Sequence, residues 1–218
     1  MIRTTRKQLF AAVPLALGMA SAPVMAYQAG DFIVRGGIAS VVPGGSYSEV
    51  ADGAYNLRAN SDQQVGLSLS YMMTDAFSVN LLAASPFRHD IQAQEFDGAT
   101  IGETRHLPPT LTVSWYPTAG MDLPVRPYIG AGVNYTTFFE EDLNAAGRNE
   151  LGTSDLELDD SFGMAAQVGV DVPIDDQWSV GAAAYYMDIE TDVEVGGNDI
   201  GTVEIDPMVY RLHMVYQF

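Results

Sequence analysis

The sequence predicts an all-β protein: an eight-stranded antiparallel transmembrane β-barrel in an up-and-down meander, preceded by a cleaved signal peptide. Three observations lead to this prediction. Apolar and polar residues alternate with a period of two in repeated segments, which is typical of strands with two unlike faces. The connections between these segments alternate between short and long, and the chain ends in an aromatic residue, Phe218. Transmembrane barrels combine these features, with both termini on the periplasmic side.

The first 26 residues have the pattern of a signal peptide. A basic start with Arg3, Arg6 and Lys7 precedes an apolar run from Leu9 to Ala20, and Val24-Met25-Ala26 suits cleavage by signal peptidase. The apolar run is shorter than the ~20 residues that a membrane-spanning helix needs, which disfavours an anchor. We therefore expect a signal peptide over residues 1–26 and a single barrel domain over residues 27–218.

Four strands are expected in the first half of the domain. The first covers residues 31–42. The second places on one face Val65, Leu67, Leu69 and Tyr71, and the third places there Phe77, Val79, Leu81 and Ala83. The fourth alternates Thr110, Thr112 and Ser114 with Leu111, Val113 and Trp115. Each segment therefore has one face suited to lipid and one that is polar or small.

Four more strands are expected in the second half. The fifth lies within residues 125–139, with one face formed by Val125, Ile129, Ala131, Val133 and Tyr135. The sixth alternates from Phe162 to Asp171, and the seventh from Trp178 to Met187. The last has one face formed by Met208, Tyr210, Leu212, Met214, Tyr216 and Phe218. No helical stripe interrupts this period-two pattern.

The connections differ in length in a regular order. Thr74-Asp75, Pro117 to Pro124, and Pro173 to Asp176 are short and turn-like. The stretches at about 43–63, 88–106, 140–160 and 190–203 are long, and we expect them to be polar loops. A soluble β-sandwich has no reason to sort its loops in this way, whereas a barrel has short periplasmic turns and longer outer loops.

Aromatic residues gather at the expected periplasmic ends of strands: Trp115, Tyr116, Trp178 and Phe218. An aromatic girdle is expected at that level of the membrane. A terminal aromatic residue is also the mark by which the barrel assembly machinery recognises its clients, so we expect that machinery to bind Phe218. Outer-membrane lipid and lipopolysaccharide are the other expected neighbours.

Composition excludes several functions. Without the signal peptide, seven arginines remain against 28 acidic residues, a net charge of −21. This charge argues against nucleic acid as a partner, because phosphates require a basic surface. The chain has no cysteine, so neither a disulfide framework nor a thiolate site can form. No cofactor is implied.

The expected inward faces are small or apolar rather than charged, with glycine, serine, alanine and threonine frequent beside larger residues. Alternation places inward Asn80, Leu82, Tyr128, Asn134, Gln167, Tyr185, Met187 and His213. Such a lining binds an apolar solute by desolvation and opposes hydrated ions. Arg126, Asp171, Arg211 and His213 are the charged exceptions, and we expect them to pair near the periplasmic end.

Several uninterrupted blocks are distinctive: LLAASPFRH at 81–89, HLPPTL at 106–111, RPYIGAGVNYTTFF at 126–139, QVGVD at 167–171, YMDI at 186–189 and Asp206-Pro207. Together these blocks resemble the OmpW family of outer-membrane proteins. The first long loop and the 140–160 loop show no clear correspondence. The resemblance implies an eight-stranded channel in the outer membrane of a Gram-negative cell, with an apolar lumen that admits small hydrophobic molecules. It also implies a lumen constriction at Leu82 and Tyr185, although relatives carry tryptophan at the second position.

Catalysis and metal binding are not expected. His89 and His106 flank the second long loop, and Ser85 could complete a nucleophilic triad, but no nucleophile elbow is present. Residues 142–147 resemble a calcium loop only faintly, because Thr153 stands where a bidentate glutamate is needed. The acidic 140–160 loop suggests a solvated face, and divalent ions that bridge it to lipopolysaccharide are a hypothesis that EDTA would test.

The expected function is therefore passive uptake of small hydrophobic molecules through a narrow apolar lumen. The alternative is a structural or receptor-type outer-membrane barrel that acts through its acidic extracellular loops. An enzyme is not expected, because the chemistry it would need is not assembled by any motif.

Overall fold

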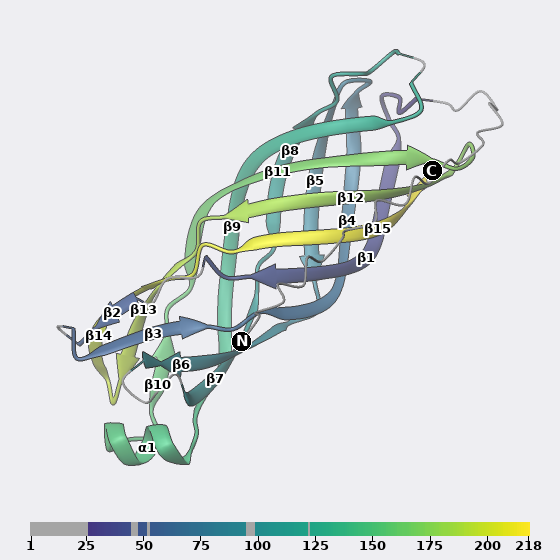
Figure 1. Ribbon diagram of the computed structural model, residues 1–218. Helices are drawn as coiled ribbons and strands as arrows, with labels where there is room; N and C mark the ends of the chain where they lie inside the picture. The colour runs from purple at the N-terminus through teal and green to yellow at the C-terminus, as the bar shows by residue number, and fades with distance from the viewer. Residues whose placement is uncertain (1–25, 45–47, 52, 95–98, 122) are drawn as a thin grey trace, which may run out of the picture.

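Eight antiparallel strands close into a barrel in the computed structural model, which describes residues 26–44, 48–51, 53–94, 99–121 and 123–218 (Figure 1). Of the expected signal peptide, residues 1–26, only Ala26 lies within the described residues. The barrel strands are β1 (Phe32–Val42), β4 (Asp62–Thr74), β5 (Phe77–Ala84), β8 (Thr110–Trp115), β9 (Arg126–Leu143), β11 (Ser161–Pro173), β12 (Trp178–Met187) and β15 (Met208–Gln217). The β9–β11 and β15–β1 pairings close the ring, which confirms the predicted fold class.

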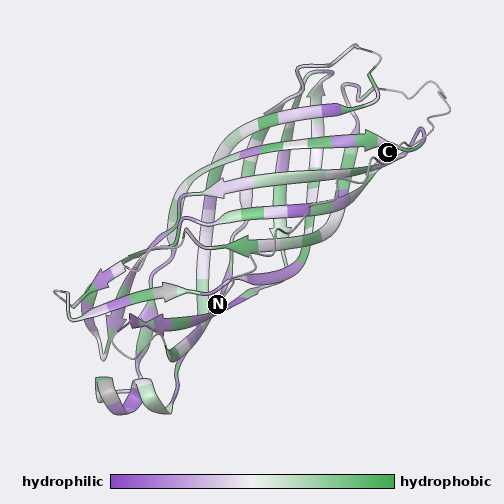
Figure 2. Ribbon diagram, in the orientation of Figure 1, coloured by the Kyte–Doolittle hydropathy of each residue, from purple (hydrophilic) through white to green (hydrophobic). Residues whose placement is uncertain are grey.

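The register places apolar side chains on the outer face of the wall. Ile38 of β1 lies opposite Leu212 of β15 and Val65 of β4, and all three side chains are more than half exposed. The next residues along β1 and β15, Ala39 and Arg211, point inward and are buried. The resulting alternation along the barrel strands is visible in Figure 2. An outward apolar band over closed hydrogen-bonded strands suits contact with hydrocarbon.

The short connections lie together at one end of the barrel, as predicted. They join β4 to β5, β8 to β9 and β11 to β12. The barrel's first and last residues meet at the same end, where the Phe218 amide donates to the Phe32 carbonyl at 2.9 Å. Both ends of the barrel domain therefore lie beside the short turns.

The long connections lie at the other end, as predicted, but they are ordered strands and a helix rather than polar loops. These stretches contain β2 (Ser48–Val50), β3 (Tyr55–Ala59), β6 (Phe87–Ala93), β7 (Ala99–Leu107), α1 (Ala145–Leu151), β10 (Leu156–Leu158), β13 (Glu190–Val195) and β14 (Asn198–Glu204). We call them, with the end of β9, the cap. The physical reason for its order is burial of two apolar clusters, formed by Val50, Leu57, Ala93 and Ile101 and by Leu143, Leu156 and Val193.

Strand β9 connects the barrel to the cap. Its 18 residues span about 60 Å at roughly 3.4 Å per residue, much more than the 9–11 residues of a typical membrane strand. Its first part pairs with β8 and β11 in the barrel, and its last part pairs with β7. The cap is thus a continuation of the sheet rather than a set of separate loops.

The sequence pattern showed no helix, but the cap contains a short one, α1. Asn144 precedes it and its side-chain oxygen accepts from the Ala146 and Gly147 amides at 2.9 and 3.0 Å. Gly152 ends the helix with φ +71°, a conformation that glycine adopts at little cost. A helix of 7 residues is too short for a recognisable apolar stripe. Among the described residues, no helix is both long and apolar enough to cross a bilayer.

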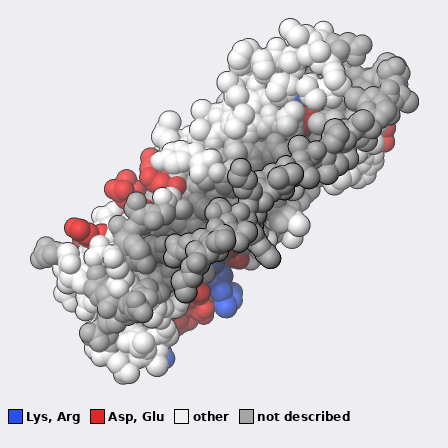
Figure 3. Space-filling view, viewed as in Figure 1, with Lys and Arg blue, Asp and Glu red and all other residues white. Residues whose placement is uncertain are grey.

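Acidic side chains gather on the cap, while the visible barrel wall is almost free of charge (Figure 3). Two exposed arginines of the cap pair with some of these acids: Arg88 with Glu103 at 3.6 Å and Arg105 with Glu140 at 2.8 Å. Within the part of the chain that the structure describes, no group of three or more histidine or acidic side chains is arranged to hold a metal ion.

Candidate functional site

An apolar pocket opens among the cap strands, which we call the cap pocket. The space between its lining atoms, open mouth included, is about 840 Å³, and the centre of a water-sized sphere reaches about 60 Å³ of it. Nearly all of its exposed lining is carbon, supplied by residues such as Leu57, Ile91, Ile101, Leu156, Val193 and Ile200. The cap strands form this lining because they turn apolar side chains inward and polar ones, many of them acidic, to water. An apolar molecule that enters the pocket leaves water for a hydrocarbon surface.

Four buried rings lie at the inner side of the cap pocket, and we call them the aromatic cluster. His89 and His106 stack with ring centroids 4.8 Å apart, Phe87 stacks on His106 at 5.6 Å, and Phe138 lies 5.8 Å from His106. Each ring is at most 7% exposed. His89 and Phe138 line the cap pocket, and Phe87 lines the next pocket inward. The cluster therefore separates two apolar spaces.

Both histidines of the cluster are neutral at physiological pH. Burial, and to a smaller extent the neighbouring His89, lowers the pKa of His106 to about 3. Burial also lowers the pKa of His89, against the opposing hydrogen bond between its Nδ1 and the Asn60 carbonyl at 2.5 Å. Ser85 donates its hydroxyl hydrogen to Gln64 at 2.9 Å rather than to a histidine, so the triad considered from the sequence does not form.

A second, smaller pocket lies inside the barrel below the aromatic cluster, and we call it the inner pocket. The space between its lining atoms is about 320 Å³, but the centre of a water-sized sphere reaches only about 20 Å³ of it, so the side chains nearly fill it. Leu82 of β5 and Tyr185 of β12 both line it, and they are 8% and 3% exposed. Met187, Val209 and Arg211 line it as well. The structure thus brings together the two residues to which the sequence resemblance assigns a constriction.

Arg211 is the charged member of the inner pocket. It is 2% exposed, and its guanidinium lies over the Tyr185 ring at 5.3 Å from the centroid. Its neighbours across the sheet, Ala39 and Ala183, are small and leave it room. Its Nε and Nη1 atoms have no hydrogen-bond partner among the described residues.

A polar layer of amides and hydroxyls crosses the barrel interior from β5 to β11. Asn80 donates to the Ser114 hydroxyl at 2.8 Å and accepts from Ser78 at 2.9 Å. Gln167 donates to Thr112 at 2.9 Å and also to Ser114. Nearer the cap, Asn134 donates to Thr110 at 2.9 Å. These side chains satisfy one another, as buried polar groups require.

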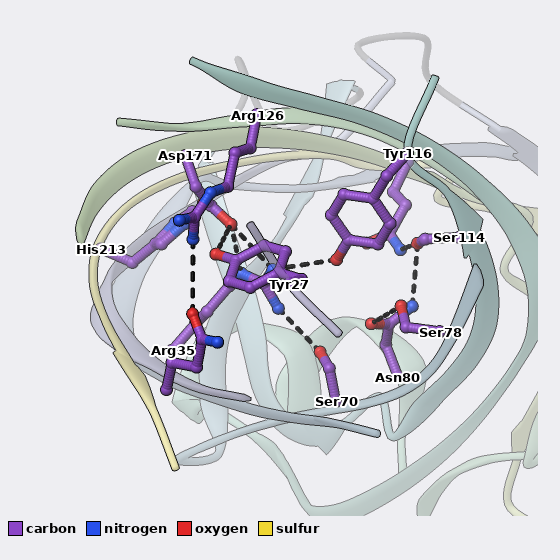
Figure 4. Close-up of polar contacts among 12 residues, drawn as sticks. Tyr27, Arg35, Ser70, Ser78, Asn80, Ser114, Tyr116, Arg126, Asp171 and His213 are labelled. Carbon is purple, nitrogen blue, oxygen red and sulfur yellow. Dashed lines mark hydrogen bonds and ion pairs between the residues drawn. The ribbon is translucent and has the colours of Figure 1, made fainter. Parts of the chain in front are cut away.

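Near the short turns, a charged network fills the bore, and we call it the Asp171 network (Figure 4). Asp171 is fully buried and accepts from the Tyr27 hydroxyl at 2.9 Å and from Arg35 Nη2 at 2.8 Å. His213 Nε2 lies 3.0 Å from its second oxygen. Arg35 also donates to Ser70 at 2.7 Å and to Tyr116 at 3.0 Å. The network joins strands from opposite sides of the barrel.

The expectation that Arg126, Asp171, Arg211 and His213 pair with one another is only partly right. Asp171 does contact His213, but its second cation is Arg35. Arg126 instead lies over the Tyr27 ring at 4.3 Å and donates to Gln217 at 3.4 Å. Sequence reasoning missed Arg35, although the signal was present: a charged residue inside the otherwise apolar 32–42 strand.

Glycine in the wall makes room for these large side chains. A Cβ atom at Gly181 would lie 2.4 Å from Asp171 Oδ1 and 2.5 Å from His213 Nε2. A Cβ atom at Gly169 would lie 2.3 Å from the ring of Tyr128, which is buried against the wall there. Any larger residue at either position has to displace part of the interior.

The family model described as the OmpW family matches residues 28–218. The chain belongs to the OmpW family. Outer membrane protein W of Vibrio cholerae serotype O1 is 45% identical over 218 residues, which cover 97% of this chain and 100% of the relative. That of Escherichia coli K12 is 40% identical over 219 residues, with the same coverage.

A solved structure agrees with this membership. The crystal structure of the outer membrane protein OprG from Pseudomonas aeruginosa is 36% identical to this chain, with a TM-score of 0.80. The match covers 89% of this chain and 99% of OprG. As a member of the OmpW family with outer-membrane barrels as its relatives, the chain is an outer-membrane protein. The short turns are then periplasmic and the cap is extracellular.

Proposed function

We propose that this OmpW-family protein is a passive channel through which small hydrophobic molecules enter from the cell exterior. The observation that carries the proposal is a continuous series of buried apolar side chains. It begins in the cap pocket, passes the aromatic cluster and reaches the inner pocket at Leu82 and Tyr185. Burial of an apolar solute along this series gains roughly 25 cal/mol for each Å² removed from water.

The same interior opposes hydrated ions. The cap pocket offers almost no polar surface to replace the water around an ion. An ion would lose its hydration there without compensation, at a cost of several kcal/mol. The acidic residues of the cap lie on its surface and do not line the cap pocket.

The Asp171 network lies between the inner pocket and the periplasmic turns. Its residues are bonded across the bore, from Arg35 on β1 to Asp171 on β11 and Tyr116 after β8. A molecule that reaches the inner pocket therefore has to leave through the wall or displace these side chains. Both routes suit slow passage of single small molecules rather than an open aqueous pore.

Truncation of the constriction tests the proposal. Replacement of Leu82 or Tyr185 by alanine widens the inner pocket, so uptake of a neutral apolar probe should rise several-fold. The measurement is uptake into liposomes whose outer leaflet is lipopolysaccharide, because phospholipid alone lets such probes pass. A fluorescent probe that lights up in an apolar environment reports the rate.

The adjacent outward residues supply matched controls. Leu81 and Tyr186 face lipid, at 48% and 43% exposure, and their replacement by alanine should leave the uptake rate unchanged. If neither inward variant changes uptake, the lumen does not conduct. That result would favour the alternative of a structural or receptor barrel that works through its acidic cap.

A further inference from the structure

The interior of this acidic protein is positively charged. Among the described residues, the buried side chains with permanent charge are Arg35, Arg126, Arg211 and Asp171. Asp171 is thus the single buried carboxylate of that set, and Arg35 already occupies it at 2.8 Å. The whole chain carries a net charge of −18, so this excess of cations in the interior is opposite in sign to the protein as a whole.

Arg211 has the least compensated charge of this group. Arg35 has an aspartate, a serine and a tyrosine as hydrogen-bond partners, whereas Arg211 Nε and Nη1 have none among the described residues. The ring of Tyr185 faces its guanidinium and offers a cation–π contact, which leaves the Nε and Nη1 donors unused. A buried cation with free donors is costly unless a counter-charge completes it.

The surroundings of Arg211 indicate which kind of anion could supply its missing counter-charge. The guanidinium shares the inner pocket with Leu82, Met187 and Val209, which present only carbon and sulfur. A ligand that suits both parts has an anionic group for Arg211 and a narrow apolar body, for which the side chains of Leu82 and Met187 have to move aside because the pocket is nearly filled. A planar carboxylate matches the fork of guanidinium donors better than a spherical ion does.

We propose that Arg211 binds the carboxylate of an apolar monocarboxylic acid in the inner pocket, so that the channel prefers such acids to their neutral analogues. This inference rests on the proposed channel function and names its substrate class. The acidic cap does not prevent entry, because its charges are exposed and are screened over about 8 Å at physiological salt. Inside the barrel, the buried arginines produce a positive electrostatic potential that attracts an anion.

Paired probes of one shape test the inference. Binding of octanoate and of octan-1-ol to the mature protein in lipid nanodiscs is measured by calorimetry, with empty nanodiscs as the blank. The wild type should bind octanoate about tenfold more tightly than the alcohol, since the two differ only in the charged group. Arg211→Met should remove this preference, so that the two probes bind with similar affinity. Arg211→Lys should keep most of it.

An exposed arginine serves as the control. Arg88 is about half exposed in the cap, and Arg88→Gln should bind both probes as the wild type does. Folding of every variant is checked by the different migration of unboiled and boiled protein in gels. If Arg211→Met does not fold, the ratio of the two affinities in the wild type and in Arg211→Lys still decides the question.

The outcomes separate the two proposals. Equal affinity of the wild type for both probes, or unchanged octanoate binding in Arg211→Met, overturns the acid preference while the channel for neutral molecules stands. Binding of neither probe to the wild type overturns both. If Arg211→Met loses the preference for octanoate while Arg211→Lys and Arg88→Gln keep it, the result supports Arg211 as the residue that binds the carboxylate.

Discussion

At the scale of single residues, the Asp171 network shows how one carboxylate is kept charged inside a barrel. Asp171 lies against Arg35, Tyr27 and His213, so each of its oxygens faces a donor. Gly181 provides the space, because a methyl group there would collide with both Asp171 and His213. Such an ion pair contributes little to the stability of the fold compared with a well-packed apolar core. Removal of one partner, however, leaves the other charge buried without compensation.

Replacement of Asp171 by asparagine should therefore destabilise the barrel by about 3–5 kcal/mol, because Arg35 remains buried without its anion. The matched control is Arg88→Gln, which breaks an exposed pair with Glu103 and should cost at most about 1 kcal/mol. Urea titration of the barrel in lipid vesicles, followed by gel migration of unboiled samples, measures both. If Asp171→Asn loses no more free energy of unfolding than the control, the network does not stabilise the barrel.

At the scale of secondary-structure elements, the β6–β7 hairpin connects the barrel to the cap pocket. It carries three rings of the aromatic cluster, Phe87, His89 and His106, and pairs with β3 on one side and β9 on the other. Its order depends on two buried histidines that are uncharged. The stability of the hairpin therefore depends on pH.

We expect the hairpin to loosen as the pH falls from 7 to 5. The unfolded histidines take up a proton near pH 6.5, whereas in the folded cap the pKa of His106 is lowered to about 3 and that of His89 is also lowered. Below pH 6.5 the open state therefore binds more protons, which favours it by up to about 1.4 kcal/mol per pH unit and per group.

Amide hydrogen exchange measures this effect, after correction for the intrinsic dependence of exchange on pH. Exchange in β6 and β7 should be roughly tenfold or more faster at pH 5 than at pH 7. His106→Phe retains a ring in the stack and should reduce the difference. Equal corrected rates at the two pH values in the wild type would contradict the prediction.

At the scale of the whole molecule, the protein consists of two parts with different solvents. The barrel is apolar outside, where it meets lipid, and closes its interior with Asn80, Gln167 and the Asp171 network. The cap is acidic outside, where it meets water, and apolar within. Strand β9 passes through both parts, so the apolar face changes from the outer to the inner side along one strand.

This inversion predicts different costs for one substitution at two heights of β4. Leu69 faces lipid near the middle of the barrel, at 46% exposure, and Leu69→Arg should destabilise the barrel by about 2–4 kcal/mol. Gln63 faces outward on the same strand near the cap, and Gln63→Arg should cost about 0–1 kcal/mol. The free energy of unfolding of both variants is measured in lipid vesicles. Equal losses of this free energy would argue against a membrane around Leu69.

Much of the site could be predicted from the sequence. Period-two alternation places Asn80, Leu82, Gln167, Tyr185 and His213 on inward faces, and the structure buries each of them. This works because each strand of the wall has one face toward lipid and one face toward the barrel interior. A shift of the register by one residue would therefore reverse the direction of every side chain. The partners of these side chains were less predictable, as Arg35 and Arg211 show.

The sequence by itself determined the closed eight-stranded barrel, its position in the outer membrane and the direction of its side chains, because those depend on alternation and on connection lengths. Only the tertiary structure decided the order of the cap, the aromatic cluster and the pairing of Asp171 with Arg35. The physical reason is distance along the chain. Arg35 and Asp171 are 136 residues apart, and only the closed ring of strands brings them within hydrogen-bond distance.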